Sequence, residues 1–257
     1  PPAAVDCGRR LPKAAGRGAA EGGRKRPNGS PKAIGMKIGK QMKKVLNKVL
    51  VVNAGSSSLK YMLFDMNAEQ MLCKGLVERI GIAGSRLAYT KTGCEKIVRE
   101  MPLKDHVAAI GAVMAVLCDP ACGVVKSLAE IDAIGHRVVH GAATFAEPAK
   151  VTAAAKKAIA KCARLAPLHN PANLQGIEAC EKAAKGVPNV AVFDTAFHQT
   201  MPGCAYTYAI PRKVARKFGI RKYGFHGTSH KYITQAAAAW LKKPLKRVNL
   251  VTRSEVH

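Results

Sequence analysis

The chain has 257 residues, 48% of them hydrophobic, and its 42 Lys and Arg against 16 Asp and Glu give a formal net charge of +26. This length and apolar content suffice for one large or two modest domains with their own cores. No apolar run reaches the about 18 residues of a membrane span. Eight cysteines without a C-x-x-C pair or a signal peptide favour reduced, mostly buried thiols in the cytoplasm.

Part of the positive charge is concentrated in residues 1–44, which hold twelve Lys and Arg and two Asp and Glu. This segment is rich in Pro, Gly and Ala without apolar periodicity, so we expect a disordered basic leader. Because the chain begins at Pro1, we expect its natural start at Met36 or Met42 and read the earlier residues as misread upstream sequence. The other basic residues are scattered, without an RNP-like or zinc-finger pattern, and we do not expect specific nucleic-acid binding.

Residues 48–65 read KVLVVNAGSSSLKYMLFD and predict a β-hairpin, because runs rich in apolar and β-branched residues at 49–52 and 59–64 flank a small polar loop. Gly55 permits a tight turn, and the serine hydroxyls, the loop amides and Lys60 can donate to anionic oxygens. The loop is therefore a candidate phosphate cradle, with a spacing different from that of a Walker loop. A simple polar turn is the alternative.

The next segments extend an antiparallel sheet and add a helix. Residues 71–79 and 96–101 predict strands, with glycines marking the turns between them. Asp105 is the expected N-cap of a helix over 106–117, in which Met114 fills the core.

Residues 131–139 predict a buried strand that leads into G-H-R-V-V-H-G. A guanidinium at the edge of such a strand has few partners within a sheet, so Arg137 either pairs with a carboxylate of the protein or awaits one from a ligand. His136 and His140 share one face of this strand but lie about 13 Å apart by the usual rise, too far for a single metal ion.

A helix over residues 151–164 precedes the sequence L-A-P-L-H-N-P-A-N at 165–173. Its prolines and asparagines predict a structured loop, in which His169 is an ordinary loop residue from the pattern alone. Asn173 is the expected N-cap of a helix that continues to residue 185.

Residues 190–193 predict a strand ending at Asp194, a position where α/β sheets place ligand chemistry, with a helix cap as the alternative. Residues 206–210 predict another short strand. The sequence R-K-Y-G-F-H-G-T-S-H at 221–230 predicts a turn that opens a helix through residue 241. Its amides and side chains either face an anion at the helix N-terminus or simply cap the helix.

Five strings in this chain order resemble the acetate kinase family, within the acetate and sugar kinase, Hsc70 and actin superfamily. They are N-A-G-S-S-S-L-K at 53–60, G-H-R-V-V-H-G at 135–141, L-A-P-L-H-N-P at 165–171, F-D-T-A-F-H-Q-T-M-P at 193–202 and R-K-Y-G-F-H-G-T-S-H-K-Y at 221–232. The resemblance covers residues 45–252, roughly the first half of such an enzyme. It implies an α/β, actin-like ATPase fold of the ribonuclease H-like type. Residues 45–196 are then a near-complete N-terminal domain, and 197–257 the beginning of a nucleotide-binding one.

The resemblance also assigns roles to individual positions. The catalytic positions are Asp194 and His226. The positions at the acetate carboxylate and methyl group are Arg137, Val139, Leu168 and Pro171. The positions at the nucleotide phosphates are Ser56, Ser58, Lys60, His169 and Thr228. Asn53 belongs to the site of a Mg²⁺ or Mn²⁺ ion.

The implied reaction is reversible phosphoryl transfer from ATP to acetate, giving acetyl phosphate and ADP, by an enzyme that is a homodimer at full length. Lys60, His226, a metal ion and an arginine suit this chemistry, because they neutralise the oxygens of the transferring group. A base role for Asp194 is less suited. Acetate is already ionised at pH 7, so we expect Asp194 to orient groups or metal-bound water.

Two departures from the family pattern stand out. Ala142 replaces the second glycine of the family's H-G-G, and after Thr252 the chain reads R-S-E-V-H where a C-H-L-G-N-G phosphate loop would follow. The adenine pocket, a second arginine and a metal-site glutamate belong to the missing half, so we expect a truncated enzyme with little or no turnover. The alternatives are a non-catalytic fragment of an interrupted gene, or a propionate or butyrate kinase, since a methylene changes discrimination by only about 1–3 kcal/mol.

Overall fold

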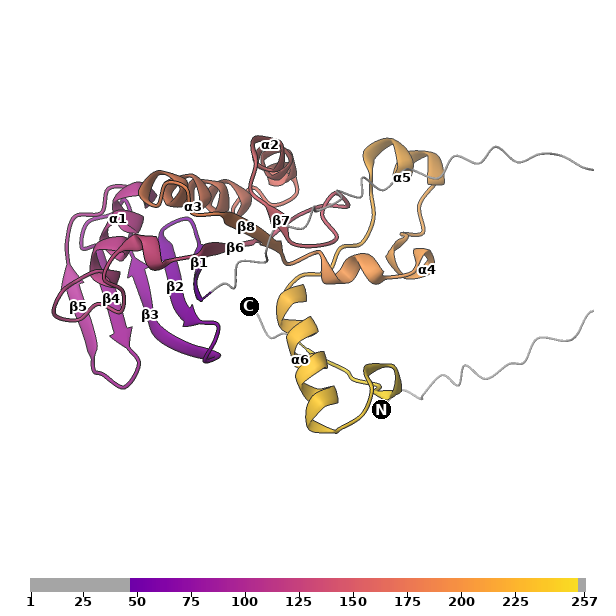
Figure 1. The fold of residues 1–257 in the computed structure, drawn as a ribbon. Helices are drawn as coiled ribbons and strands as arrows, with labels where there is room; N and C mark the ends of the chain where they lie inside the picture. The colour runs from indigo at the N-terminus through magenta and orange to yellow at the C-terminus, as the bar shows by residue number, and fades with distance from the viewer. Residues whose placement is uncertain (1–46, 254–257) are drawn as a thin grey trace, which may run out of the picture. The chain divides into compact units, whose positions relative to one another are not determined.

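A computed structural model of the chain describes residues 47–253 (Figure 1). The basic leader expected over residues 1–44, and the start expected at Met36 or Met42, lie outside these residues. The chain divides into two units between Lys43 and Lys44, and the fold described below belongs to the second unit.

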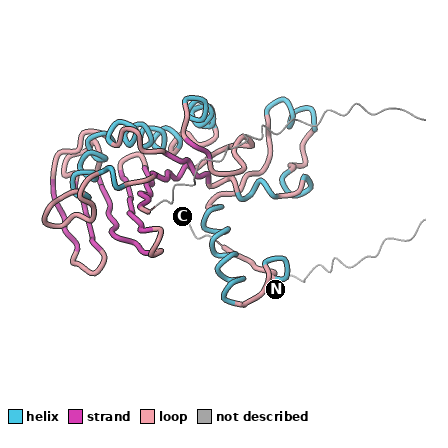
Figure 2. Tube along the Cα trace, in the orientation of Figure 1, coloured by secondary structure: helices cyan, strands magenta, loops and turns pink. Residues whose placement is uncertain are grey.

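An eight-stranded sheet in the order β5-β4-β3-β2-β1-β6-β8-β7 organises the described residues (Figures 1 and 2). Its strands are β1 (Lys48–Ala54), β2 (Ser58–Asp65), β3 (Gln70–Glu78), β4 (Arg86–Lys91), β5 (Lys96–Glu100), β6 (Ala133–Val138), β7 (Ala149–Lys150) and β8 (Asn189–Phe193). Strands β1 to β5 form an antiparallel meander. Strand β6 runs parallel to β1, and β8 parallel to β6, so the carboxyl ends of these three strands meet at one edge of the sheet.

The helices that carry the core are α1 (His106–Leu117) and α3 (Asn170–Ala183), which lie beside each other on the sheet in Figure 1. The remaining helices are α2 (Ala153–Lys161), α4 (Gly203–Tyr206), α5 (Arg212–Phe218) and α6 (Gly227–Trp240), with 3-10 turns at Leu128–Glu130, Cys162–Arg164, Phe197–Thr200 and Leu245–Arg247. None of the helices within residues 47–253 is long and apolar enough to cross a membrane.

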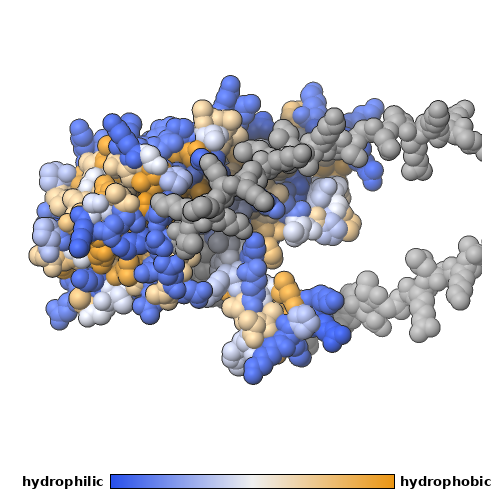
Figure 3. Space-filling model, viewed as in Figure 1, coloured by the Kyte–Doolittle hydropathy of each residue, from blue (hydrophilic) through white to orange (hydrophobic). Residues whose placement is uncertain are grey.

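The core follows from the alternation that predicted the hairpin. Leu50, Val52 and Ala54 of β1 are buried, and Leu59 and Leu63 of β2 face the same cluster. Each of the fully buried leucines and the valine contributes about 1.5–3 kcal/mol relative to an exposed one. Hydrophilic residues are spread over the face of the molecule that Figure 3 shows.

Most elements lie where the sequence predicts them. The hairpin forms, and the Asp105 side chain accepts the Ala108 amide at 2.8 Å as the N-cap of α1. Met114 lies in the core, 4% exposed. Strand β8 ends directly before Asp194. These elements combine strong apolar periodicity with a local capping or turn residue, so local sequence is sufficient to place them.

Three expectations are wrong, and one strand was missed. Strand β4 was not predicted, because its sequence RLAYTK lacks a run of β-branched residues and is placed by pairing with β3 and β5. Helix α3 begins at Asn170 with His169 as N-cap, so Asn173 is not the cap. Residues 206–210 form no strand; α4 ends at Tyr206, and no strand of the described residues pairs with this segment. The seven described cysteines are free as expected, but only three of them, Cys73, Cys162 and Cys180, are buried.

Candidate active site

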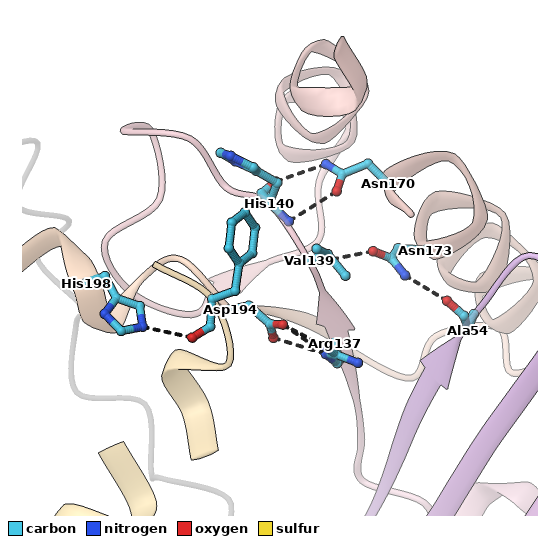
Figure 4. Close-up of polar contacts among 9 residues, drawn as sticks. Ala54, Arg137, Val139, His140, Asn170, Asn173, Asp194 and His198 are labelled. Atoms are coloured by element: carbon cyan, nitrogen blue, oxygen red, sulfur yellow. Dashed lines mark hydrogen bonds and ion pairs between the residues drawn. The ribbon is translucent and has the colours of Figure 1, made fainter. Parts of the chain in front are cut away.

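The candidate site is built on an ion pair at the carboxyl edge of the parallel strands. Arg137 comes from β6, and Asp194 follows β8 (Figure 4). The Nη2 of Arg137 donates to Asp194 Oδ2 at 2.7 Å, and its Nε donates to Oδ1 and Oδ2 at 3.1 and 3.2 Å. The hydrogen bonds to Asp194 raise the pKa of the Arg137 guanidinium, which stays charged. Of the two partners that the sequence left open for Arg137, the structure shows the carboxylate of the protein.

The two partners differ in exposure. The side chain of Asp194 is 3% exposed, whereas that of Arg137 is 38% exposed. A guanidinium has five N–H donors in a planar fork, and Asp194 occupies the edge formed by Nε and Nη2. Nη1 of Arg137 forms no hydrogen bond to any residue within 47–253. The Nη1–Nη2 edge can therefore receive a second carboxylate while Asp194 stays in place.

The backbone of Asp194 joins the end of β8 to β6 and to the start of α6. Its amide donates to the Val138 carbonyl at 3.0 Å, and its carbonyl accepts from the Gly227 amide at 2.9 Å. A Cβ at Gly227 would lie 2.3 Å from the Asp194 carbonyl oxygen, so only glycine permits this approach. The contact holds the first turn of α6 at the end of β8, and with it His226 and Thr228. His226, the N-cap of α6, has a left-handed backbone with φ of 54°.

The aromatic residues before α6 contact the end of β6 as well. The ring of His140 lies 4.7 Å from that of Tyr223 and 5.5 Å from that of Phe225, both edge to face. His198 Nε2 donates to the Phe225 carbonyl at 2.9 Å. These contacts bring the segment that carries His226 to the same edge of the sheet as Arg137.

The hairpin loop has the features expected of an anion cradle. The Gly55 amide donates to the Ser58 carbonyl at 2.7 Å, and His106 Nε2 donates to the Gly55 carbonyl at 2.7 Å. Within the described residues, the amides of Ser56 and Ser57 form no hydrogen bonds. The loop is thus fixed from both sides while two of its amides remain available to a ligand.

The other predicted positions surround these groups less closely. Asn53 and Lys60 are paired neighbours on β1 and β2, with Asn53 half-buried and Lys60 exposed. Val139 follows β6 and is half-buried. Three further positions lie around the start of α3, namely Leu168, which is 78% exposed, His169 and Pro171. None of them forms a side-chain hydrogen bond to Arg137 or Asp194. The structure therefore unites the arginine and the aspartate directly and leaves the residues around the start of α3 as an outer group.

Two asparagines without a predicted role in the site hold this edge together. Asn173 joins Val139 to Ala54, and Asn170 bonds both backbone groups of His140. Their spacing of three residues on one helix was the available signal, because such residues share a helix face. It was missed because Asn173 was read as a cap.

Ala142 stands where the resemblance implies a glycine, and it lies in a turn with a left-handed backbone. Ala142 has a φ of 49°, in the left-handed region that favours glycine. Its amide donates to His140 Nδ1 at 2.9 Å, and its carbonyl accepts from Gln199 Nε2 at 2.8 Å. These two bonds to backbone groups of Ala142 hold the turn in this conformation.

Comparisons with known proteins agree on one family. The acetokinase family matches residues 48–254. The acetate kinase of Caldicellulosiruptor saccharolyticus is 57% identical over 205 residues, which are 80% of this chain and 51% of that protein. The acetate kinase of Thermotoga maritima is 55% identical over the same shares of the two chains. The chain spans about half the length of the curated relatives it matches.

Solved structures give the same result. The crystal structure of Porphyromonas gingivalis acetate kinase matches with a TM-score of 0.74 and 46% identity over 77% of this chain and 50% of that one. A propionate kinase from Francisella tularensis matches with a TM-score of 0.72 and 40% identity over the same shares. The α/β, actin-like ATPase fold expected from the sequence is confirmed. The chain belongs to the acetokinase family.

Proposed function

We propose that this chain supplies the carboxylate-binding half of an acetate kinase, which transfers a phosphoryl group reversibly between ATP and acetate. The observation that carries the proposal is the Arg137–Asp194 pair, in which a buried carboxylate fixes a half-exposed guanidinium and leaves one of its edges available. Family membership suggests the reaction, and the similarity to acetate kinases suggests acetate as the substrate.

In this proposal the acetate carboxylate binds the Nη1–Nη2 edge of Arg137. A planar fork binds a carboxylate through two parallel hydrogen bonds, which fixes the direction of the attacking oxygen. Val139, Leu168 and Pro171 take the side of the methyl group, because their apolar side chains lie where β6 ends and α3 begins. Orientation of this kind is the main contribution a protein makes to phosphoryl transfer.

Asp194 acts in this scheme as the residue that orients Arg137. Acetate carries no proton at neutral pH, so its attack requires no base. Both carboxylate oxygens of Asp194 are already engaged by Arg137, which suits orientation better than proton transfer. His226 lies at the adjacent start of α6, and we assign it to stabilising the transferring phosphoryl group.

The hairpin is proposed to hold the nucleotide phosphates. Ser56 and Ser58 offer hydroxyls, the available loop amides offer donors, and Lys60 adds an exposed positive charge beside them. Thr228 and His169 complete the proposed phosphate group from the starts of α6 and α3. Hydrogen-bond donors of this kind stabilise the negatively charged oxygens of a phosphate most strongly in a site that excludes water.

The residues present fit a Mg²⁺ or Mn²⁺ ion only in part. Asn53 offers one hard amide oxygen, of the kind these ions prefer, whereas Asp194 is engaged by Arg137. Within residues 47–253 there is no group of three or more His, Cys, Asp and Glu placed to hold a metal ion. Magnesium usually keeps water ligands and binds substrate phosphates, so Asn53 would contribute a single ligand. When bound, the ion would neutralise phosphate charge.

The wider assignments belong to the same proposal. They are a domain formed by residues 45–196, the start of a nucleotide-binding domain in 197–257, a cytoplasmic location and a homodimer of the full-length enzyme. Propionate is the second candidate substrate, favoured by the match to the Francisella tularensis propionate kinase.

The test is an acetyl phosphate assay, with hydroxylamine trapping, on the purified 257-residue chain supplied with ATP, Mg²⁺ and acetate or propionate. We expect binding of acetate with little or no turnover, because the family's second arginine and adenine pocket belong to the half of the relatives that this chain does not span. Turnover at rates typical of kinases, about 1–100 s⁻¹, would show instead that these residues are sufficient. A chain that binds neither acid would support a non-catalytic fragment.

A further inference from the structure

The pairing of β1 with β6 stops two residues before either strand ends. They pair from Val49 with Ala133 to Val52 with His136, although β1 continues to Ala54 and β6 to Val138. At the same offset Ala54 would pair with Val138. In a parallel ladder, a carbonyl accepts from the amide that follows its partner residue, so a ladder continued to the ends of both strands would join the Val139 amide to the Ala54 carbonyl.

Both groups face the right way for this bond. Lys48 of β1 accepts from Asp132, and alternate residues of a strand face the same neighbour, so the Ala54 carbonyl also faces β6. The Val138 carbonyl accepts from Asp194 of the β8 side, and the adjacent Val139 amide therefore faces β1.

The side chain of Asn173 occupies the position of the missing bond. Its Oδ1 accepts from the Val139 amide at 3.0 Å, and its Nδ2 donates to the Ala54 carbonyl at 2.7 Å (Figure 4). Asn173 is 3% exposed. One direct hydrogen bond is thus replaced by two in series across an amide, which holds the two strand ends further apart.

The helix that carries Asn173 is positioned for this contact. Gly176 lies three residues further along the same face of α3, and a Cβ there would come 2.6 Å from the Cβ of Ala54. The absence of a side chain lets α3 approach β1 closely. One turn earlier, Asn170 Oδ1 accepts from the His140 amide at 3.1 Å and Nδ2 donates to the His140 carbonyl at 2.9 Å.

We propose that Asn173 is a positioning residue that sets the distance between the hairpin loop after Ala54 and the guanidinium of Arg137. Its amide prevents the last step of pairing between β1 and β6, which would draw the phosphate side of the site toward the carboxylate side. The effect on ligand binding rests on the proposed function, whereas the effect on strand pairing does not.

The test compares Asn173→Ala and Asn173→Asp with the unchanged chain. In Asn173→Ala we expect a direct hydrogen bond from Val139 to Ala54, detected as a scalar coupling between that amide nitrogen and that carbonyl carbon in isotope-labelled protein. In Asn173→Asp the carboxylate still accepts from Val139 but repels the Ala54 carbonyl, so no new coupling forms. In both variants we expect the dissociation constant for acetate, measured by NMR titration, to rise about tenfold or more, since small displacements of a site are costly.

Asn189→Ala is the matched control. Asn189 is also buried, at 5% exposed, and bonds His136 and the Val187 carbonyl at the opposite end of β8. We expect it to lose stability without a change in acetate affinity. The proposal is overturned if Asn173→Ala shows no new coupling, or if both Asn173 variants bind acetate as the unchanged chain does. If the unchanged chain binds no acetate, the proposed function fails, but the new scalar coupling in Asn173→Ala still decides this inference. If Asn173→Ala does not fold, the acetate affinity of Asn173→Asp decides it.

Discussion

Arg137 and Asp194 form a pair in which the acid is buried and the base is half-exposed, with 2.7 Å between Nη2 and Oδ2. The asymmetry has an energetic consequence. A buried charge that loses its partner destabilises the fold more than an exposed charge does, because water still solvates the exposed charge. The same asymmetry leaves the guanidinium, and not the carboxylate, accessible to a ligand.

Replacing Arg137 and replacing Asp194 should therefore lower the free energy of unfolding by different amounts. We expect Arg137→Met, which leaves the Asp194 carboxylate buried without its cation, to lower the free energy of unfolding by about 3–5 kcal/mol. Asp194→Asn leaves a half-exposed cation and should cost about 1–3 kcal/mol. Urea unfolding of both variants, and of the double variant Arg137→Met with Asp194→Asn, completes the cycle. A double variant as unstable as the sum of the single ones would contradict direct coupling of the pair.

Ala142 offers a stabilising substitution. Its φ of 49° costs an L-residue about 1–2 kcal/mol, whereas glycine adopts this conformation freely. After the larger entropy of glycine in the unfolded chain is subtracted, Ala142→Gly should raise the free energy of unfolding by about 0.5–1 kcal/mol. The neighbouring exposed Ala143 is the control, because its φ is not positive and Ala143→Gly should destabilise. Equal effects of the two substitutions in urea unfolding would show that the turn is not strained.

Gly227 should tolerate no side chain. An alanine Cβ would lie 2.3 Å from the Asp194 carbonyl oxygen, so the start of α6 must move. We expect Gly227→Ala to lower the free energy of unfolding by about 1–3 kcal/mol, as other overpacked contacts do. Gly111→Ala in the middle of α1 is the control, since nothing lies within 4 Å of its added Cβ. That variant should be more stable by about 0.5–1 kcal/mol, because alanine is the better helix former. Thermal unfolding in which both variants shift in the same direction would contradict this account.

Two buried histidines should make the protein less stable in mild acid. Burial lowers the pKa of His136, which donates to Asn189 at 2.7 Å, and burial also lowers the pKa of His140, whose Nδ1 accepts from the Ala142 amide. An unfolded histidine has a pKa of about 6.5, so below that pH the unfolded chain binds more protons than the native one. Stability is therefore full above this pH and falls as the pH drops from 6.5 toward the native pKa values.

The measurement is urea unfolding at pH 7.5 and pH 5.5. We expect the loss of free energy between the two pH values to be smaller in His136→Gln and in His140→Gln than in the unchanged chain. Contributions of the carboxyl groups are common to all three proteins and cancel in the comparison. An unchanged loss in both variants would rule out these histidines as the cause.

The elements that local sequence could place are those with both a period and a terminal signal, such as the hairpin around Gly55 and the helix capped by Asp105. Strand β4 could not be placed this way, since its neighbours in the sheet determine it. Within the site, the family strings indicated Arg137 and Asp194 separately, and only the parallel register of β6 and β8 shows that they form a pair. Asn173 was misread because asparagine suits both a helix cap and a bridging amide, and the local sequence does not distinguish the two roles.

The most direct test is a titration of the isotope-labelled 257-residue chain with acetate, following the guanidinium N–H signals of Arg137 by NMR. We expect saturable shifts in the unchanged chain and loss of acetate binding in Arg137→Lys. Lysine keeps the charge and can still pair with Asp194, but a single ammonium does not offer a second planar edge to another carboxylate. Acetate binding of equal affinity in Arg137→Lys would contradict the assignment of Arg137 as the carboxylate-binding residue.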